Sequence, residues 1–157
     1  MRSILYPPTI DWNFLFQRPQ QLMTQFALNN WKVHYVNKTQ RYKDVEEVRD
    51  NLYLYHDFSI FLNRVKKVDI LYISSPRQHY ICDKIQADII IYDCVDKFIE
   101  WNKHEKKILN RADIVFTTSQ YLYDEKSKYH DHVFLVKNAC DYKFFQGDFK
   151  MPIDLSR

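Results

Sequence analysis

The chain has 157 residues, of which 46% are hydrophobic and 17% aromatic, and this composition excludes a disordered or low-complexity protein. The formal net charge is only +3 and the lysines are scattered, so the composition gives no sign of a nucleic-acid partner. A single glycine, Gly147, excludes the glycine-rich phosphate loops of P-loop proteins and of NAD enzymes.

The cysteine pattern and the apolar runs indicate where the protein resides. Its three cysteines are far apart and form no Cys-x-x-Cys pair, which argues against a zinc ribbon or a disulfide framework and favours a reducing compartment. No apolar run reaches the about 18 residues that span a bilayer, and the N-terminus has no signal-peptide core. We therefore expect a soluble cytoplasmic protein.

The first 36 residues predict a strand, a helix and a second strand. Residues 4–6 form an apolar strand that Pro7 stops, and residues 18–30 form a helix with Pro19 in its first turn. Residues 32–36 alternate between polar and apolar side chains and predict the next strand. Together they make a βαβ unit.

The rest of the chain continues this alternation. The charged stretch 41–50 predicts an exposed helix or loop, and strands are expected around residues 52–55 and over 68–73, 87–92, 112–118 and 132–136, with helices over 58–65, 77–86, 97–111 and 120–129. Alternating strands and helices predict the α/β class, a doubly wound and mostly parallel Rossmann-like sheet with helices on both faces. We place the domain at residues 1–137 and a separate tail at 138–157.

The stretch 87–96 holds the best candidates for chemistry. Its apolar run predicts an interior strand that ends at Asp93 and Asp96, and ligands of open α/β sheets bind beyond the carboxyl ends of the strands. A carboxylate placed there can act as a general base toward a hydroxyl nucleophile. The alternative for Asp96 is a structural role as the N-cap of the following helix.

Three residues around the first helix are candidates for substrate binding. Arg18 lies in the first helical turn, where it could hold an anionic group or simply pair with an acid. Asp11 and Trp12 could form a lip for a sugar, because an aromatic face packs on a sugar ring while a carboxylate accepts hydroxyl protons. The alternative for this loop is a hydrophobic plug over the sheet edge.

Other polar residues give weaker signals. Arg77 and His79 follow a predicted strand and are expected to line the same cleft, although most lone histidines are not bases. His130 and His132 lie at a strand start, and we predict no metal site. The lysines of the segment 103–107 could touch an anionic membrane surface, but we favour a solvated helix face as their explanation.

Several stretches, in order and at similar spacing, resemble the N-terminal domain of bacterial glycosyltransferases of the GT-B fold. They are the segments 12–22 (Trp-Asn-Phe-Leu-Phe-Gln-Arg-Pro-Gln-Gln-Leu), 33–36, 92–96 (Tyr-Asp-Cys-Val-Asp), 112–119 (Ala-Asp-Ile-Val-Phe-Thr-Thr-Ser) and 136–141 (Val-Lys-Asn-Ala-Cys-Asp), with Phe144 and Phe145. The last of these motifs departs from the family's usual Asn-Gly-x-Asp because it has no glycine.

The resemblance implies the acceptor-binding half of a two-domain enzyme. Such a domain binds no cofactor itself, and a C-terminal domain or separate subunit would bind a nucleotide-sugar donor. The segment 138–157 then corresponds to the crossing segment toward that second half, so the chain alone would be inactive. The resemblance adds Asn138 to the substrate-binding residues and supports Asp96 or Asp93 as the base.

Two functions follow as hypotheses. The first is transfer of a sugar to a sugar or lipid-linked acceptor in cell-surface polysaccharide or glycolipid synthesis, in the cytoplasm or at the inner face of the membrane. The second is a non-enzymatic α/β module that binds a ligand or partner through Trp12, Phe14 and Phe16.

Overall fold

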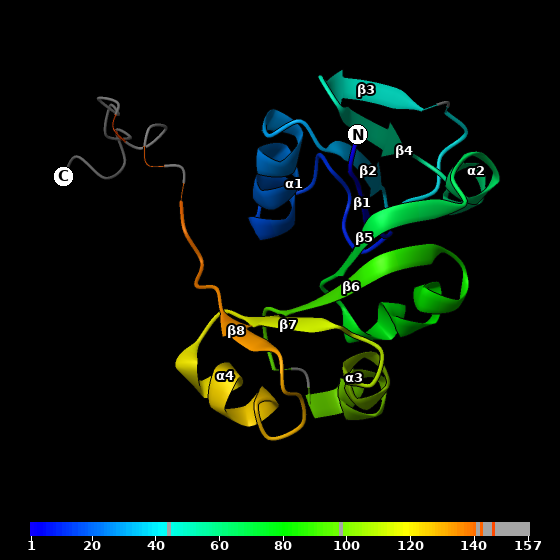
Figure 1. Cartoon of the computed structure of the whole chain (residues 1–157). Coiled ribbons are helices and arrows are strands. Elements are labelled where there is room, and N and C mark those ends of the chain that lie inside the picture. Colours follow the sequence, from blue (N-terminus) through cyan, green and yellow to red (C-terminus); the bar gives the residue numbers. More distant parts are fainter. Residues whose placement is uncertain (44, 98, 141, 143–145, 147–157) are drawn as a thin grey trace.

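A computed structural model describes residues 1–43, 45–97, 99–140, 142 and 146. One eight-stranded sheet has the order β3-β4-β2-β1-β5-β6-β7-β8 (Figure 1). The strands are β1 (Ser3–Tyr6), β2 (Lys32–Val36), β3 (Glu46–Arg49), β4 (Leu52–Tyr55), β5 (Lys67–Ile73), β6 (Gln86–Cys94), β7 (Ile114–Thr117) and β8 (Val133–Leu135). Neighbouring strands are parallel except β3 and β4, so the predicted α/β class with a mostly parallel Rossmann-like sheet is confirmed.

The path of the chain through the sheet reverses next to β1. After β1 the chain forms β2, β3 and β4 on one side of β1. It then returns to the other side of β1 and continues through β5 to β8. In open α/β sheets the crevice at such a reversal, beyond the carboxyl ends of the strands, is the usual ligand site. The topology therefore predicts a ligand site at the carboxyl ends of β1 and β5.

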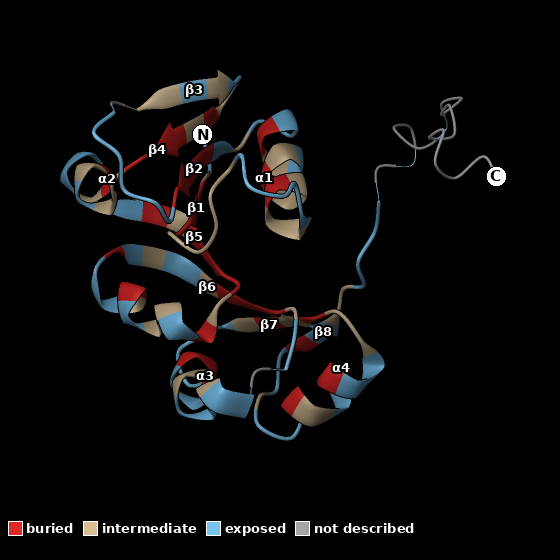
Figure 2. Ribbon diagram, turned by 180° about the vertical axis from the view of Figure 1, so that it is seen from behind, coloured by how far each residue is buried: buried red, intermediate tan, exposed pale blue. Residues whose placement is uncertain are grey.

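Successive residues of each strand point to opposite faces of the sheet, so the core has two layers. Ile4 and Tyr6 pack on one face with Met23 of helix α1 (Arg18–Leu28). Leu5 and Leu71 pack on the other face, which is covered by α2 (Phe58–Arg64), the 3₁₀ helix η1 (Pro76–Asp83), α3 (Asn102–Leu109) and α4 (Gln120–Lys126). Figure 2 shows the buried residues concentrated along the strands between these layers.

Three expectations about local structure were wrong. The charged stretch 41–50 contains β3, an antiparallel edge strand, because an edge position tolerates charged side chains while Val48 packs against the core. The segment after β5 is the 3₁₀ helix η1 instead of an α-helix over 77–86. The helix predicted over 97–111 is divided into the short 3₁₀ helix η2 (Ile99–Trp101) and α3.

Strand β6 also differs from its prediction. It continues through Asp93 to Cys94, two residues beyond the predicted end, because the Asp93 carboxylate is satisfied inside the protein. Its first half is less buried than expected, with Ile89 38% exposed. None of the helices in the described part of the chain is long and apolar enough to cross a membrane.

One buried histidine makes the fold sensitive to acid. His34 in β2 is 3% exposed, its Nδ1 atom lies 3.0 Å from the Tyr55 hydroxyl, and its ring contacts Phe61 at 5.5 Å. Burial, with a smaller effect of the Lys32 charge, lowers the pKa of His34 from 6.5 to about 4. Between these two values the unfolded chain binds a proton that the folded chain does not.

We therefore predict that stability falls as the pH drops from 6.5 to 4, with His34 contributing about 3 kcal/mol of this loss. Urea denaturation across this range measures it. The variant His34→Phe should show a shallower pH dependence, whereas the exposed His132→Asn should keep the wild-type slope. Equal slopes for His34→Phe and the wild type would contradict the prediction.

Candidate functional site at the carboxyl ends of the strands

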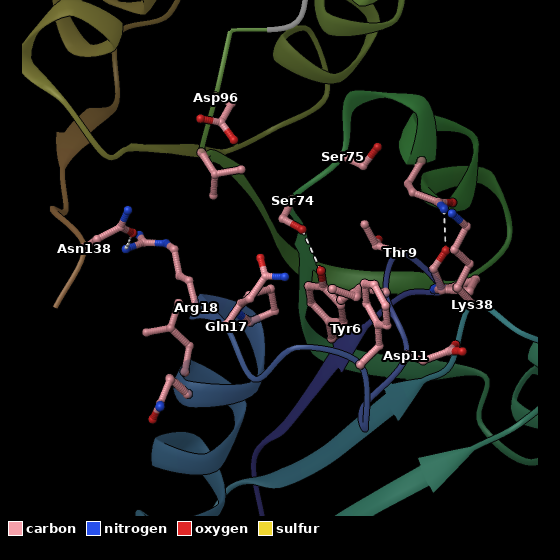
Figure 3. Close-up of a pocket in the computed structure, with 18 of the residues that line it drawn as sticks. Tyr6, Thr9, Asp11, Gln17, Arg18, Lys38, Ser74, Ser75, Asp96 and Asn138 are labelled. Atoms are coloured by element: carbon pink, nitrogen blue, oxygen red, sulfur yellow. Dashed lines mark hydrogen bonds between the residues drawn. The ribbon is translucent and has the colours of Figure 1, made fainter. Parts of the chain in front are cut away.

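An open cavity of about 1840 Å³ lies where β1, β5, β6 and β8 end, beside the first turn of α1. Figure 3 shows Arg18 and Asn138 on one side of it, Asp11 and Lys38 on the other, and Asp96 across from them. The cavity occupies the reversal point of the sheet, the position that the topology favours for a ligand.

Asp93 forms the structural centre of the site. It is fully buried on the face that carries α1, and Arg18 binds both of its oxygens, with Nε at 2.7 Å from Oδ2 and Nη2 at 3.0 Å from Oδ1. The Arg18 side chain is itself only 12% exposed. This bidentate pair ties the start of α1 to the middle of the sheet.

Arg18 also reaches the segment that follows β8. Its Nη1 atom lies 3.4 Å from the Lys137 carbonyl oxygen and 3.3 Å from Asn138 Oδ1. The guanidinium therefore joins three parts of the chain, and its charge is matched by Asp93. Of the two roles considered for Arg18, pairing with an acid is the one that the structure contains.

Two buried tyrosines lie near Asp93, and one of them, Tyr6, lines the cavity. The Tyr6 hydroxyl lies 2.7 Å from Ser74 Oγ, and burial raises the pKa of Tyr6 to about 12. Burial also raises the pKa of Tyr72 well above its usual value, and the Asp93 charge adds to this effect. Both hydroxyls stay protonated at neutral pH and therefore cannot act as bases.

Asp96 is exposed and lines the cavity from the loop after β6. Thr118 Oγ1 donates to the Val95 carbonyl at 2.8 Å, and Lys97 Nζ contacts the Tyr121 hydroxyl at 2.7 Å. The Thr118 hydrogen bond holds the backbone immediately before Asp96. The alternative of an N-cap is wrong, because α3 begins only at Asn102 and its N-cap residue is Trp101.

A buried polar cluster supports this loop from the opposite face of the sheet. Lys126, 2% exposed, binds Glu105 at 2.8 Å, and Glu105 also accepts a hydrogen bond from Tyr92 at 3.0 Å. Cys94 Sγ lies 3.7 Å from the Asp96 carbonyl oxygen, and burial raises the pKa of the Cys94 thiol to about 12. The thiol is therefore a packing group and not a nucleophile.

Asp11 and Trp12 have different positions relative to the cavity, although they are adjacent in the chain. Asp11 lines the cavity, and although burial opposes its ionisation, hydrogen bonds from Thr39 lower its pKa overall. Trp12 turns inward against Tyr35, with ring centroids 5.1 Å apart, and is not among the lining residues. Trp12 is thus the hydrophobic plug of the alternative interpretation, and Asp11 remains a candidate for ligand binding.

Of Arg77 and His79, only Arg77 lines the cavity. Arg77 lines the cavity, and its guanidinium carbon lies 5.8 Å from the centroid of the Trp101 ring. His79 lies outside the lining and stacks on His104, with ring centroids 5.3 Å apart. Partial burial, followed by the nearby Lys107 charge, lowers the pKa of His79.

Several polar lining residues were not identified from the sequence, among them Gln17, Lys38, Ser74, Ser75 and Lys137. Ser74 and Ser75 directly follow β5, so the rule that selected Asp93 and Asp96 would have found them. In the described ranges no group of three histidine, cysteine or acidic side chains could hold a metal ion. Within the predicted crossing segment, residues 141, 143–145 and 147–157 lie outside the described residues.

Comparison with known proteins supports the fold. No protein-family model and no curated protein matches the sequence. Among solved structures, the chain is similar to a sucrose-phosphate synthase from Thermosynechococcus elongatus, with a TM-score of 0.62, 11% sequence identity and coverage of 92% of both chains. The protein therefore has a glycosyltransferase-like Rossmann-type fold.

We predict that removing one partner of the Arg18–Asp93 pair destabilises the protein more than removing both. The variant Arg18→Met leaves a carboxylate buried without its partner and should lower the free energy of unfolding by about 3 to 5 kcal/mol. The double variant Arg18→Met/Asp93→Leu should lose less than this, because no charge is then buried. Urea denaturation of both variants measures the difference.

The exposed pair of Arg111 and Asp83, at 2.6 Å, provides the matched control. Arg111→Met should lower the free energy of unfolding far less than Arg18→Met does, because solvent screens that pair. A similar loss for Arg18→Met and Arg111→Met would contradict the role assigned to the buried pair.

Proposed function

We propose that this chain is the acceptor-binding part of a glycosyltransferase that moves a sugar from a nucleotide-sugar to a hydroxyl group. The observation that carries the proposal is the cavity at the reversal point of the sheet, which presents an exposed carboxylate, Asp96, from a fixed loop. The fold shared with a sucrose-phosphate synthase is consistent with this reaction class.

In the proposed reaction Asp96 acts as the general base. Its carboxylate accepts the proton of the acceptor hydroxyl while that oxygen attacks the anomeric carbon of the donor. The bond from the anomeric carbon to the nucleotide phosphate breaks, and the phosphate leaves with the bonding electrons. We assign the base to Asp96 rather than Asp93, because Arg18 occupies both oxygens of Asp93 and the carboxylate is buried.

The remaining lining residues suit a polar acceptor. Ser75, Asn138 and Gln17 offer hydroxyl and amide groups, and Asp11 and Arg77 add charged groups at the wall. Such a mixture of donors and acceptors matches the hydroxyl groups of a sugar. The donor would be bound by a separate domain or subunit, and the ordered motifs of the sequence favour an acceptor in cell-surface polysaccharide or glycolipid synthesis at the cytoplasmic side of the membrane.

The test is a transfer assay in which a donor-binding domain is joined to this chain or supplied as a second chain. With nucleotide-sugars and candidate acceptors present, Asp96→Asn should lower kcat about 10²- to 10⁴-fold. Asp131→Asn, an exposed aspartate before the amino end of β8 and so at the opposite end of that strand from the cavity, should leave the rate unchanged. Full activity in Asp96→Asn would exclude it as the base.

A second candidate function is that of a binding module without catalysis. It is favoured by the exposure of Phe14 and Phe16, at 60% and 55%. Trp12, the third residue considered for this role, faces the core. A stable complex with a partner protein, formed by a chain whose gene has no donor-binding domain encoded nearby, would support this function over sugar transfer.

A further inference from the structure

The loop between β1 and α1 exposes three large apolar side chains in a row. Phe14 is 60% exposed, Leu15 65% and Phe16 55%, and Phe14 also lines the mouth of the cavity. Apolar side chains gathered in this way on a surface mark a binding site more often than scattered ones do. We call residues 14–16 the apolar tip.

A buried glutamine holds this loop in place. Gln20 is fully buried, and its Nε2 atom lies 3.3 to 3.4 Å from four backbone carbonyl oxygens, those of Asp11, Trp12, Phe14 and Leu15. Its Oε1 atom accepts a hydrogen bond from the Gln17 amide at 3.1 Å. The exposed tip is therefore part of a specifically built loop.

The backbone of the tip is strained. Leu15 has a φ of 43°, in the left-handed region that is unfavourable for a residue with a large side chain and that glycine or asparagine adopts more easily. Strain of this kind persists where the surroundings impose it, and it gathers at binding and catalytic sites. Gln20 contacts the carbonyl oxygen of this residue at 3.3 Å.

Basic residues lie on a segment that is hydrogen-bonded to the same loop, and one of them, Lys38, lines the cavity together with Phe14. The loop is attached to the segment after β2, since Asn37 Oδ1 accepts from the Trp12 amide and Asp11 Oδ1 accepts from the Thr39 amide, both at 2.7 Å. That segment carries Lys38 and Arg41, both exposed. Apolar side chains next to cations are the combination that binds an anionic membrane surface, where the former enter the interface and the latter meet the lipid headgroups.

We propose that the apolar tip, together with Lys38 and Arg41, binds the surface of a bilayer that contains anionic lipids. A tip of three side chains is small compared with the about 800 Å² per partner of a stable protein interface, whereas it is sufficient to enter the interfacial region of a membrane. Phe14 and Lys38 also line the cavity, but the proposal does not depend on sugar transfer, because it is tested without substrates.

Flotation with vesicles tests the proposal on the whole chain. Wild-type protein should bind vesicles of equal parts phosphatidylcholine and phosphatidylglycerol at 50 mM salt, and less so at 500 mM salt or on pure phosphatidylcholine. Phe14→Ser/Phe16→Ser should weaken binding at least tenfold, and Lys38→Gln/Arg41→Gln should remove most of its salt dependence. Tyr129→Ser, at a residue that is 70% exposed elsewhere, should have no effect.

A second variant distinguishes a loss of membrane binding from a loss of folding. Leu15→Asn keeps a residue that tolerates the left-handed backbone while it removes one apolar side chain, so it should fold at least as stably and bind vesicles more weakly. The absence of wild-type binding at 50 mM salt would overturn the proposal. It would also be overturned if the tip variants bound normally, or if only Lys103→Gln/Lys106→Gln/Lys107→Gln on the α3 surface lost binding.

Discussion

The site depends on a carboxylate buried inside a central strand. Asp93 lies within β6, and removing such a charge from water is costly unless a partner compensates it. Arg18 supplies two hydrogen bonds to Asp93, and its third nitrogen faces the segment after β8. An apolar pair could fill this space with similar or greater stability, so the value of the ion pair lies in the orientation it imposes. It fixes α1 against the sheet and thereby sets one wall of the cavity.

The two acids that follow the isoleucines of β6 differ because of strand geometry. Ile91 packs on the face that carries α1, and Asp93, two residues later, points to that same face. Asp96 lies beyond the last residue of the strand, where the backbone is a loop held by Thr118. Three residues of separation thus place one carboxylate in a permanent ion pair and leave the other exposed at the cavity wall.

Most of the fold could be predicted from local patterns, because each buried strand carries its own apolar run and each helix its own apolar stripe. Strand β3 could not, since a charged edge strand is defined by its pairing with β4 and not by its own residues. In the site, the sequence suggested that Arg18 either binds an anion or pairs with an acid. It could not identify Asp93 as that acid, because the two residues are 75 positions apart in the chain. The inward turn of Trp12 likewise depends on Tyr35 of β2, which no local pattern reveals.

The first turn of α1 links the cavity to the apolar tip. Arg18 and Gln20 are two residues apart on this helix, yet Arg18 reaches across to Asp93 while Gln20 binds the carbonyl oxygens of the preceding loop. Binding and catalytic loops work through rigid elements that position them, and here one helical turn positions both features. A surface that holds the tip would therefore hold the cavity at a fixed orientation to itself, with Phe14 shared between them. Because Asp96 lines the same cavity as Phe14, a membrane that bound the tip would lie close to the cavity that contains this carboxylate.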